Sequence, residues 1–272
     1  MNMVTKSTEA KRGGSAYFGI GNDGYRKYSV SLSTGLMDNG WAVTLMGALN
    51  TGDGYVKGTN YEGWTYFGNI SKVINEHHKL SLTAFGAPQW HNQRGTMHYI
   101  EDYKNSPDGG RFNNGYGYIN GVLTGSGYGY NFYHKPQISL NHYWTINEQS
   151  SLSTSLYASI ATGGRVRGNH TEWLTIDYNT GRPKDGAMMT TDGLIDFHSA
   201  MEANAASENG SEVIFTNAIN DHKWYGLLSS YKNRFTENFT LTGGFDGRYY
   251  RGYHAEMLLE AKPWISRLQM RF

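Results

Sequence analysis

Nine stretches of the chain alternate apolar and polar residues one by one, and this pattern constrains the fold more than any other feature of the sequence. The clearest stretch is residues 239–249. Its two sets of alternating residues are Phe239, Leu241, Phe245 and Tyr249, and Thr240, Thr242, Asp246 and Arg248. Side chains on a strand point to opposite faces in turn, so each stretch predicts a strand with one apolar and one polar face.

The alternation predicts an all-β fold, an antiparallel up-and-down meander of about 9–10 strands. The predicted strands are residues 15–21, 25–36, 41–50, 61–73, 80–90, 137–145, 151–161, 222–234 and 239–252. A chain of 272 residues can form one large β unit of this kind. Along the sequence we expect a short leading segment at 1–14, a β unit at 15–253 and a tail at 254–272 that can supply one more strand.

The connections between the predicted strands alternate in length. Short polar turns occupy residues 38–40, 75–79, 147–150 and 236–238, whereas the longest excursions are residues 91–136 and 162–221. Outer-membrane β-barrels have short turns at one end and long loops at the other. A soluble sandwich tends to have turns every 8–12 residues without this bias. The asymmetry therefore favours an outer-membrane β-barrel, partial or small.

Composition limits the partners. The net charge is +1 and the chain has no Cys, so we expect no nucleic acid, disulfide or thiolate metal site. The 35 Gly and 21 Tyr are unusually many, and several Tyr and Trp residues lie near predicted strand ends, which suits the interfacial belts of a membrane barrel. Aromatic residues also favour strands in general, so a soluble β-sheet protein stays open as the alternative.

Motifs for chemistry are weak. His77 and His78 would point to opposite faces of a strand, so a solvated turn is favoured over a metal site. Residues 108–115 lack the ligand spacing of a calcium loop, so we expect a flexible outer loop there. Ser126 lies between two glycines and has no predicted strand and helix around it, and residues 19–24 suit a strand end and tight turn. We expect no catalytic residue, no metal and no cofactor.

Several segments are similar to a known family. Residues 66–94, Ile176–Pro183 and Gly244–Arg251 resemble the barrel of TonB-dependent outer-membrane receptors, and Asn2–Lys6 resembles the last strand of their plug domain. The resemblance covers residues 1–253. It implies an N-terminal plug inside a 22-stranded barrel, of which this chain would hold the plug's end and the first part of the barrel. The last residues, Trp264–Phe272, alternate like a terminal barrel strand.

The resemblance implies nutrient uptake across the outer membrane, with a siderophore, cobalamin or glycan as ligand. The partners would be outer-membrane lipid, a small-molecule or glycan ligand, and the TonB system through the plug alone. The chain alone is then expected to be inactive. Two alternatives remain open: a small barrel with protease or lipase chemistry at its rim, and a vestigial structural barrel piece.

Ligand contacts are expected on the long outer loops, and polar side chains on the inward face. The loop candidates are His91, Asn92, Arg94, Tyr116, Tyr118 and Trp173. The inward candidates are Lys27, Ser151, Ser153, Asp246 and Arg248. Leu152, Leu156, Ile160, Phe239, Leu241 and Phe245 are expected on the opposite, lipid-facing side.

Overall fold

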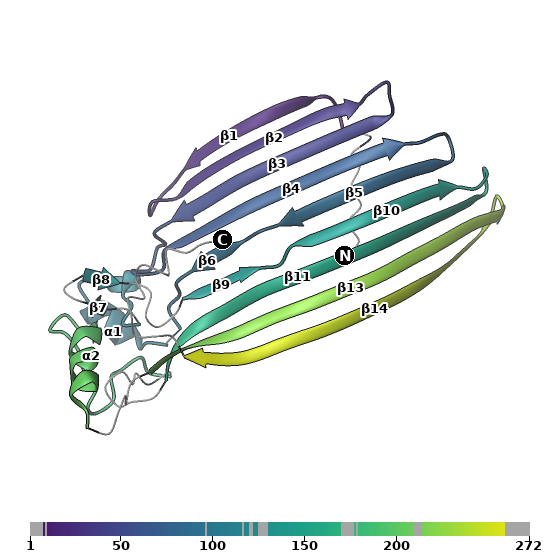
Figure 1. Ribbon diagram of the computed structural model, residues 1–272. Coiled ribbons are helices and arrows are strands. Elements are labelled where there is room, and N and C mark those ends of the chain that lie inside the picture. Colours follow the sequence, from purple (N-terminus) through teal and green to yellow (C-terminus); the bar gives the residue numbers. More distant parts are fainter. Residues whose placement is uncertain are drawn as a thin grey trace.

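The protein is mostly β, and one antiparallel sheet of 11 strands dominates it (Figure 1). The computed structural model describes residue 8 and residues 10–95, 97–115, 117–119, 122–124, 130–169, 177, 179–208 and 214–258. Nine strands form the path of the sheet in chain order: β1 (Gly13–Ile20), β2 (Arg26–Leu36), β3 (Trp41–Gly52), β4 (Tyr61–Val73), β5 (His78–Gly86), β10 (Gln137–Thr145), β11 (Ser150–Asn169), β13 (Ile214–Thr236) and β14 (Phe239–Leu258). The predicted antiparallel meander is confirmed.

Short and long connections lie at opposite ends of the sheet, as predicted (Figure 1). The turns that follow β2, β4, β10 and β13 share one end, which we call the turn end. The β1–β2 turn, the β3–β4 connection and both long excursions share the other, which we call the loop end. In the β1–β2 turn, Asp23 and Gly24 have φ of 55° and 70°, which confirms the tight turn predicted for residues 19–24.

The predicted strand 80–90 is wrong as one element, because it divides into β5 and β6 (Gln89–His91) at Ala87 and Pro88. Proline has no N–H for a sheet ladder, so the pairing is interrupted there. After the break, β6 pairs with β4 and with β9 (Asn131–His134), and β9 pairs with β11. These two short strands fill the loop end between β4 and β11, where β5 and β10 do not reach.

The expectation of an all-β chain is also corrected, since the loop end holds helices α1 (Ile100–Asn105) and α2 (Phe197–Ala206) and a short 3-10 turn, η2 (Gly109–Arg111). A second sheet of three strands lies beside them, in the order β12 (Ile195–Asp196), β7 (Gly117–Ile119) and β8 (Val122–Thr124), with β12 and β7 parallel. None of these elements shows the long two-residue alternation from which strands were predicted.

The register sorts the main sheet into two faces of opposite character. Directly paired residues share a face, so the pairing carries one face across all nine strands. The apolar face contains Phe18, Ile20, Val30, Leu32, Leu45, Ile70, Leu82, Ile138, Leu140, Leu156, Ile160, Leu227, Leu241 and Phe245. The polar face contains Ser31, Thr44, Asn69, Ser71, Ser81, Thr83, Asn141, Ser151, Ser153, Thr242 and Asp246.

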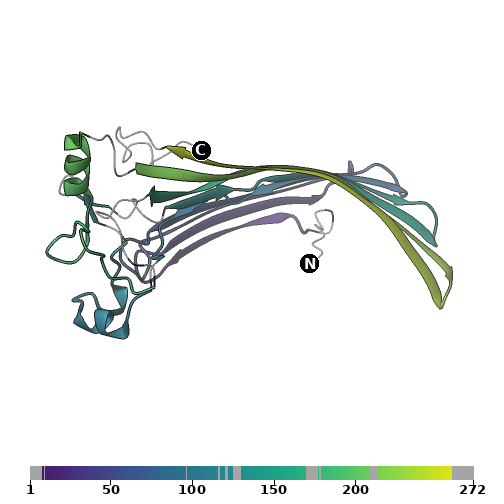
Figure 2. The ribbon, with the colours of Figure 1, turned by 90° about the horizontal axis from the view of Figure 1, so that it is seen from below.

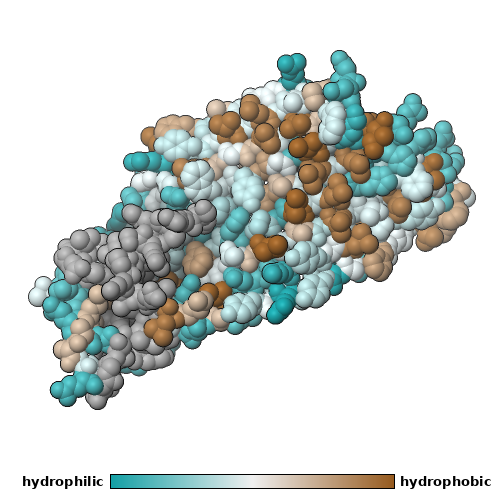
Figure 3. Space-filling model, viewed as in Figure 1, coloured by the Kyte–Doolittle hydropathy of each residue, from teal (hydrophilic) through white to brown (hydrophobic). Residues whose placement is uncertain are grey.

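The sheet is curved (Figure 2), and the two faces differ in crowding. Asn69 on the polar face is 0% exposed, whereas Leu45 and Leu156 on the apolar face are 52% and 58% exposed. Side chains are crowded together on the polar face and spread apart on the apolar face. The polar face is therefore concave and the apolar face convex. Figure 3 shows apolar side chains gathered in a band that runs across the strands.

The large buried apolar side chains gather mainly at the loop end. Leu194 and Ile195 are buried there together with Phe197 and Ala200 of α2, whereas the large apolar residues of the sheet are mostly exposed. Within the described ranges, no helix is both long enough and apolar enough to cross a membrane.

The structure bears on the expected segment limits only in part. Strand β1 begins at Gly13, and β14 continues to Leu258, beyond the predicted strand limit of 252. The segments Asn2–Lys6 and Trp264–Phe272 lie outside the described residues. β1 and β14 form the two edges of the sheet, and they do not pair with each other in the part of the chain that is described.

Candidate functional site

The loop end carries an ordered assembly of segments that come from distant parts of the sequence (Figure 1). Residues 97–115 contain α1 and η2, and residues 177–208 contain the approach to α2 and α2 itself. Polar side chains join both segments to each other and to the shorter connections of the sheet. The assembly is therefore a defined surface at one end of the polar face.

Charged pairs anchor the segment 97–115 onto the first half of the sheet. Arg111 forms an ion pair with Asp23 of the β1–β2 turn, and Asp108 forms one with Lys57 of the β3–β4 connection. Asn113 donates from Nδ2 to the Lys57 carbonyl at 2.8 Å and is 2% exposed. The loop expected at 108–115 is present, and its asparagine side chains anchor it to neighbouring segments.

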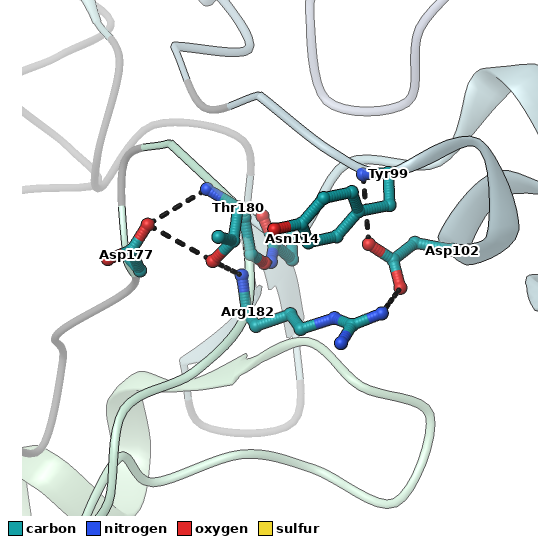
Figure 4. Close-up of polar contacts among 7 residues, drawn as sticks. Tyr99, Asp102, Asn114, Asp177, Thr180 and Arg182 are labelled. Carbon is teal, nitrogen blue, oxygen red and sulfur yellow. Dashed lines mark hydrogen bonds and ion pairs between the residues drawn. The ribbon is translucent and has the colours of Figure 1, made fainter.

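Arg182 joins the second excursion to α1 (Figure 4). Its Nη2 lies 3.2 Å from Asp102 Oδ1, and its guanidinium lies over the Tyr99 ring at 4.8 Å from the centroid. Asp102 in turn accepts the backbone N–H of Tyr99 through Oδ2 at 3.1 Å, which closes the first turn of α1. One arginine therefore holds both the carboxylate and the aromatic ring that begin this helix.

The turn at 177–182 is built around the Asp177 carboxylate (Figure 4). Asp177 Oδ1 accepts the N–H of Thr180 at 2.8 Å and that of Asn179 at 2.9 Å. Hydrogen bonds to Thr180 are the main reason why the pKa of Asp177 lies below its usual value. Asn114, 2% exposed, donates from Nδ2 to the Gly181 carbonyl and so connects the turn to the first excursion.

Arg94 and His98 lie in an aromatic cluster under α1. The Arg94 guanidinium is 5.1 Å from the Tyr103 ring centroid, and its Nη1 donates to the Phe112 carbonyl at 2.7 Å. The His98 ring meets Tyr103 and Phe112 edge to face. Burial, followed by the positive charge of Arg94, lowers the pKa of His98. At neutral pH this favours the uncharged imidazole.

The structure places the six predicted loop candidates in different surroundings. Arg94 lies in the cluster just described, and His91 is an ordinary member of β6, paired with Tyr61 and Asn131. Asn92 is 6% exposed and donates to Asn60 Oδ1 at 2.8 Å, so its role is internal. Tyr118 lies in β7, where only the backbone is described, and Tyr116 and Trp173 lie outside the described residues, as does Ser126.

Sequence reasoning missed Tyr99, Asp102, Asn114, Asp177 and Arg182. The only local signal was the turn-forming Asp177-x-Asn179-Thr180-Gly181 stretch, and nothing in the sequence indicated its partner at α1.

The concave polar face leads away from this assembly, and hydrogen bonds cross it. Asn69 Nδ2 donates to Ser81 Oγ at 2.8 Å and to Thr83 Oγ1 at 2.7 Å, and Ser71 Oγ donates to Asn69 Oδ1 at 2.7 Å. The five inward candidates, Lys27, Ser151, Ser153, Asp246 and Arg248, share this face in the register, and Asp246 pairs with Arg248.

Two buried polar atoms at the loop end of this face have no partner within the described part of the chain. They are Asn50 Oδ1 on β3 and Arg165 Nε on β11. Buried polar groups usually find partners, so these two atoms, which solvent does not reach, are suited to a hydrogen bond with an enclosed water.

The six residues predicted to face lipid lie on the apolar face together with their partners. At the turn end of that face, His78 is not part of a simple solvated turn. Its Nδ1 lies 3.0 Å from His142 Nε2, and its ring stacks on Trp144. In the described residues, no three His, Asp or Glu side chains are grouped as metal ligands.

A comparison with known protein families finds no matching family model, and a comparison with curated proteins finds no significant match.

Proposed function

We propose that this chain forms part of the wall of an outer-membrane β-barrel of the TonB-dependent receptor class, which takes up a scarce nutrient such as a siderophore, cobalamin or a glycan fragment. In this proposal the convex face contacts lipid and the concave face lines the lumen. The loop-end assembly faces outward and meets the ligand first. The observation that carries the proposal is the exposed apolar face, which is continuous over nine strands.

Such a face needs an apolar environment. Large apolar side chains on all nine strands are about half exposed, as Leu32, Phe245 and Ile160 illustrate with 59%, 59% and 53%. In soluble proteins the largest exposed apolar patch is about 300–600 Å², and larger patches mark protein or membrane contacts. Lipid chains would cover the apolar side chains of all nine strands at once. This suits a face on which the exposed apolar residues are spread over every strand.

The dimensions of the face suit a bilayer. On β4, Trp64 lies near the loop end and Lys72, paired with Trp41, lies near the turn end. These positions are eight residues apart, or about 26 Å along a strand. The usual tilt of membrane strands reduces this to about 20 Å, close to the apolar band of about 25 Å in such barrels. Aromatic rings at both limits correspond to the two interfacial belts.

The polar face and the loop end support the receptor part of the proposal. The Ser, Thr and Asn side chains of the concave face suit a watery lumen. The loop-end assembly is anchored by ion pairs and buried amides, so it offers a preformed surface rather than a loose loop. Arg165, whose Nε has no partner among the described residues, lies on the polar face at the loop end of β11.

Quenching of tryptophan fluorescence tests the membrane face. After refolding into phosphatidylcholine vesicles, brominated acyl chains should quench the apolar-face residues Trp41, Trp64 and Trp144. Their joint replacement by Phe should remove most of the quenching. Trp224 lies on the polar face, so Trp224→Phe is the control and should leave the quenched fraction unchanged. Equal effects of the two replacements would contradict the assignment of the faces.

Ligand binding tests the receptor part separately. The refolded chain is titrated with ferric siderophores, cobalamin and oligosaccharides, and binding to one class should weaken about tenfold or more in Arg165→Ala, because a charged hydrogen-bond donor is lost. Lys232→Ala, near the turn end of the same face, is the control. Failure to bind any of these ligands would reject the receptor and leave the membrane face standing.

A further inference from the structure

Two cations lie directly opposite each other on the convex face. Lys223 of β13 pairs with Arg251 of β14 in the register, and both are exposed. Like charges directly opposite each other on neighbouring strands repel and destabilise the pair. A negative group held beside both cations would offset this repulsion.

Among the described residues next to these cations in the register, only Asp221 is acidic, and no ion pair joins it to either cation. On the other side of Lys223, the partner in β11 is Ile160. The carboxylate of Asp221 lies on the same face of β13, but its Oδ1 accepts the N–H of Gly163 at 3.0 Å. Among the described residues, no ion pair joins Lys223 or Arg251 to an acidic side chain.

From the cations towards the turn end, this face becomes first aromatic and then apolar. Towards the turn end, the next pair on the same face is Tyr225 and Tyr249, whose rings stack with centroids 6.4 Å apart, and Leu227 follows on β13. The order of cation, tyrosine and apolar residue recurs on β2, as Arg26, Tyr28 and Val30. Tyrosine rings prefer the headgroup level of a bilayer, so the cations lie where lipid phosphates would be.

We propose that Lys223 and Arg251 together bind the phosphate of an anionic membrane lipid whose acyl chains lie along the apolar face. The inference rests on the proposed membrane location and adds a specific lipid contact to it. An arginine can hold two phosphate oxygens at once and a lysine adds a point charge. Both side chains carry flexible apolar stems, which can lie on the tyrosine rings while the charged ends reach the phosphate.

The test compares two double variants that remove the same charges. K223Q/R251Q removes the proposed site, whereas K232Q/R234Q removes one Lys and one Arg from the polar face near the turn end. Binding is measured on vesicles of phosphatidylcholine alone and on vesicles that also contain phosphatidylglycerol. Each cation near an anionic surface contributes about fivefold to binding. We expect K223Q/R251Q to lose on the order of tenfold of the preference for anionic vesicles, and K232Q/R234Q to keep it.

The other outcomes also decide the question. An equal loss in both double variants would mean that overall charge alone attracts the lipid, which would overturn the site. A competing titration uses inorganic phosphate, with sodium chloride at the same ionic strength as reference. Greater displacement by phosphate than by chloride would indicate a free-anion site and would overturn the lipid assignment. Unaltered tryptophan quenching in neutral vesicles shows that a lost preference does not come from a lost membrane face.

Discussion

At the scale of single residues, neighbouring positions on a strand have opposite environments, and this gives a direct test. Leu156 is 58% exposed on the convex face, whereas Ser155 lies on the polar face of the same strand. Arginine in the middle of the lipid face of a barrel costs about 2–4 kcal/mol, and lumen positions tolerate charge. Leu156→Arg should therefore reduce refolding into bilayers far more than Ser155→Arg. Equal yields in a refolding assay would count against the membrane face.

Gly181 tests the contact between the two excursions. Its φ is 67°, and a Cβ there would overlap the Met97 carbonyl oxygen and the His98 ring. Gly193 has φ 81° with open space around it, so the two sites share the backbone penalty but not the collision. Gly181→Ala should expose residues 97–115 to proteases, and Gly193→Ala should do so much less. If both variants are cleaved at the same rate, the contact does not hold the segment.

His98 predicts a pH dependence of the same contact. Its pKa is lowered from 6.5, because burial and then Arg94 disfavour the charged ring, although Asp102 acts in the opposite direction. The contribution of His98 to loop packing is complete above pH 6.5 and decreases as the pH falls through the lowered pKa. Asp177 and Asp196 also have lowered pKa values, but their contributions are lost only below 3.8. Protease resistance of residues 97–115 should fall below pH 6.5, and His98→Gln should remove this step.

At the scale of elements, the two-residue period predicted the nine main strands because each has one apolar and one polar face. It did not predict how far β11, β13 and β14 extend at the loop end, since residues 162–169 and 214–221 there no longer alternate cleanly. Pro88 divided a predicted strand in two. The helix α2 was missed because its burial depends on packing against β7 and not on a long amphipathic pattern.

The hydrogen bonds between β4 and β5 give a prediction for a pair of strands. Asn69 is fully buried, and its amide exchanges hydrogen bonds with Ser71, Ser81 and Thr83. Asn69→Ala removes the partner of Thr83 Oγ1, whereas Ser71 and Ser81 keep their mutual hydrogen bond of 2.9 Å; one unsatisfied buried group costs about 1–3 kcal/mol. Hydrogen exchange should accelerate in β4 and β5. Asn141→Ala is the control, because the Asn141 hydrogen bonds are longer, at 3.2 and 3.3 Å. A similar effect of both would mean that the network adds little.

At the scale of the whole molecule, the sequence indicated the end at which the loops meet but not their contacts. Arg182 and Asp102 are 80 residues apart, and Arg111 and Asp23 are 88 apart. No local pattern specifies such pairs, because they arise from the order in which the strands place their connections. The apolar face, by contrast, was predictable, since it needs only the alternation of each strand and the antiparallel order.

The open edges of the sheet lead to the last prediction. β14 has 20 residues and β1 has 8, and each lacks a neighbour on its outer side among the described residues. In lipid every unpaired backbone group costs several kcal/mol, and in water open edges pair with other chains. We therefore expect both edges to acquire partners, either from other copies of the chain or by closure of β1 onto β14.

Cysteine cross-linking distinguishes these arrangements, and the chain has no cysteine of its own. Ser15 of β1 and Thr242 of β14 both lie on the polar face at the edges. With S15C/T242C refolded into vesicles, a short bis-maleimide should join separate chains, because a curved sheet of nine strands in the path leaves the edges apart (Figure 2). Ser155→Cys, on an interior strand, should stay monomeric. A cross-link within one chain would instead show closure into a smaller barrel, and the absence of any link would contradict the edge argument itself.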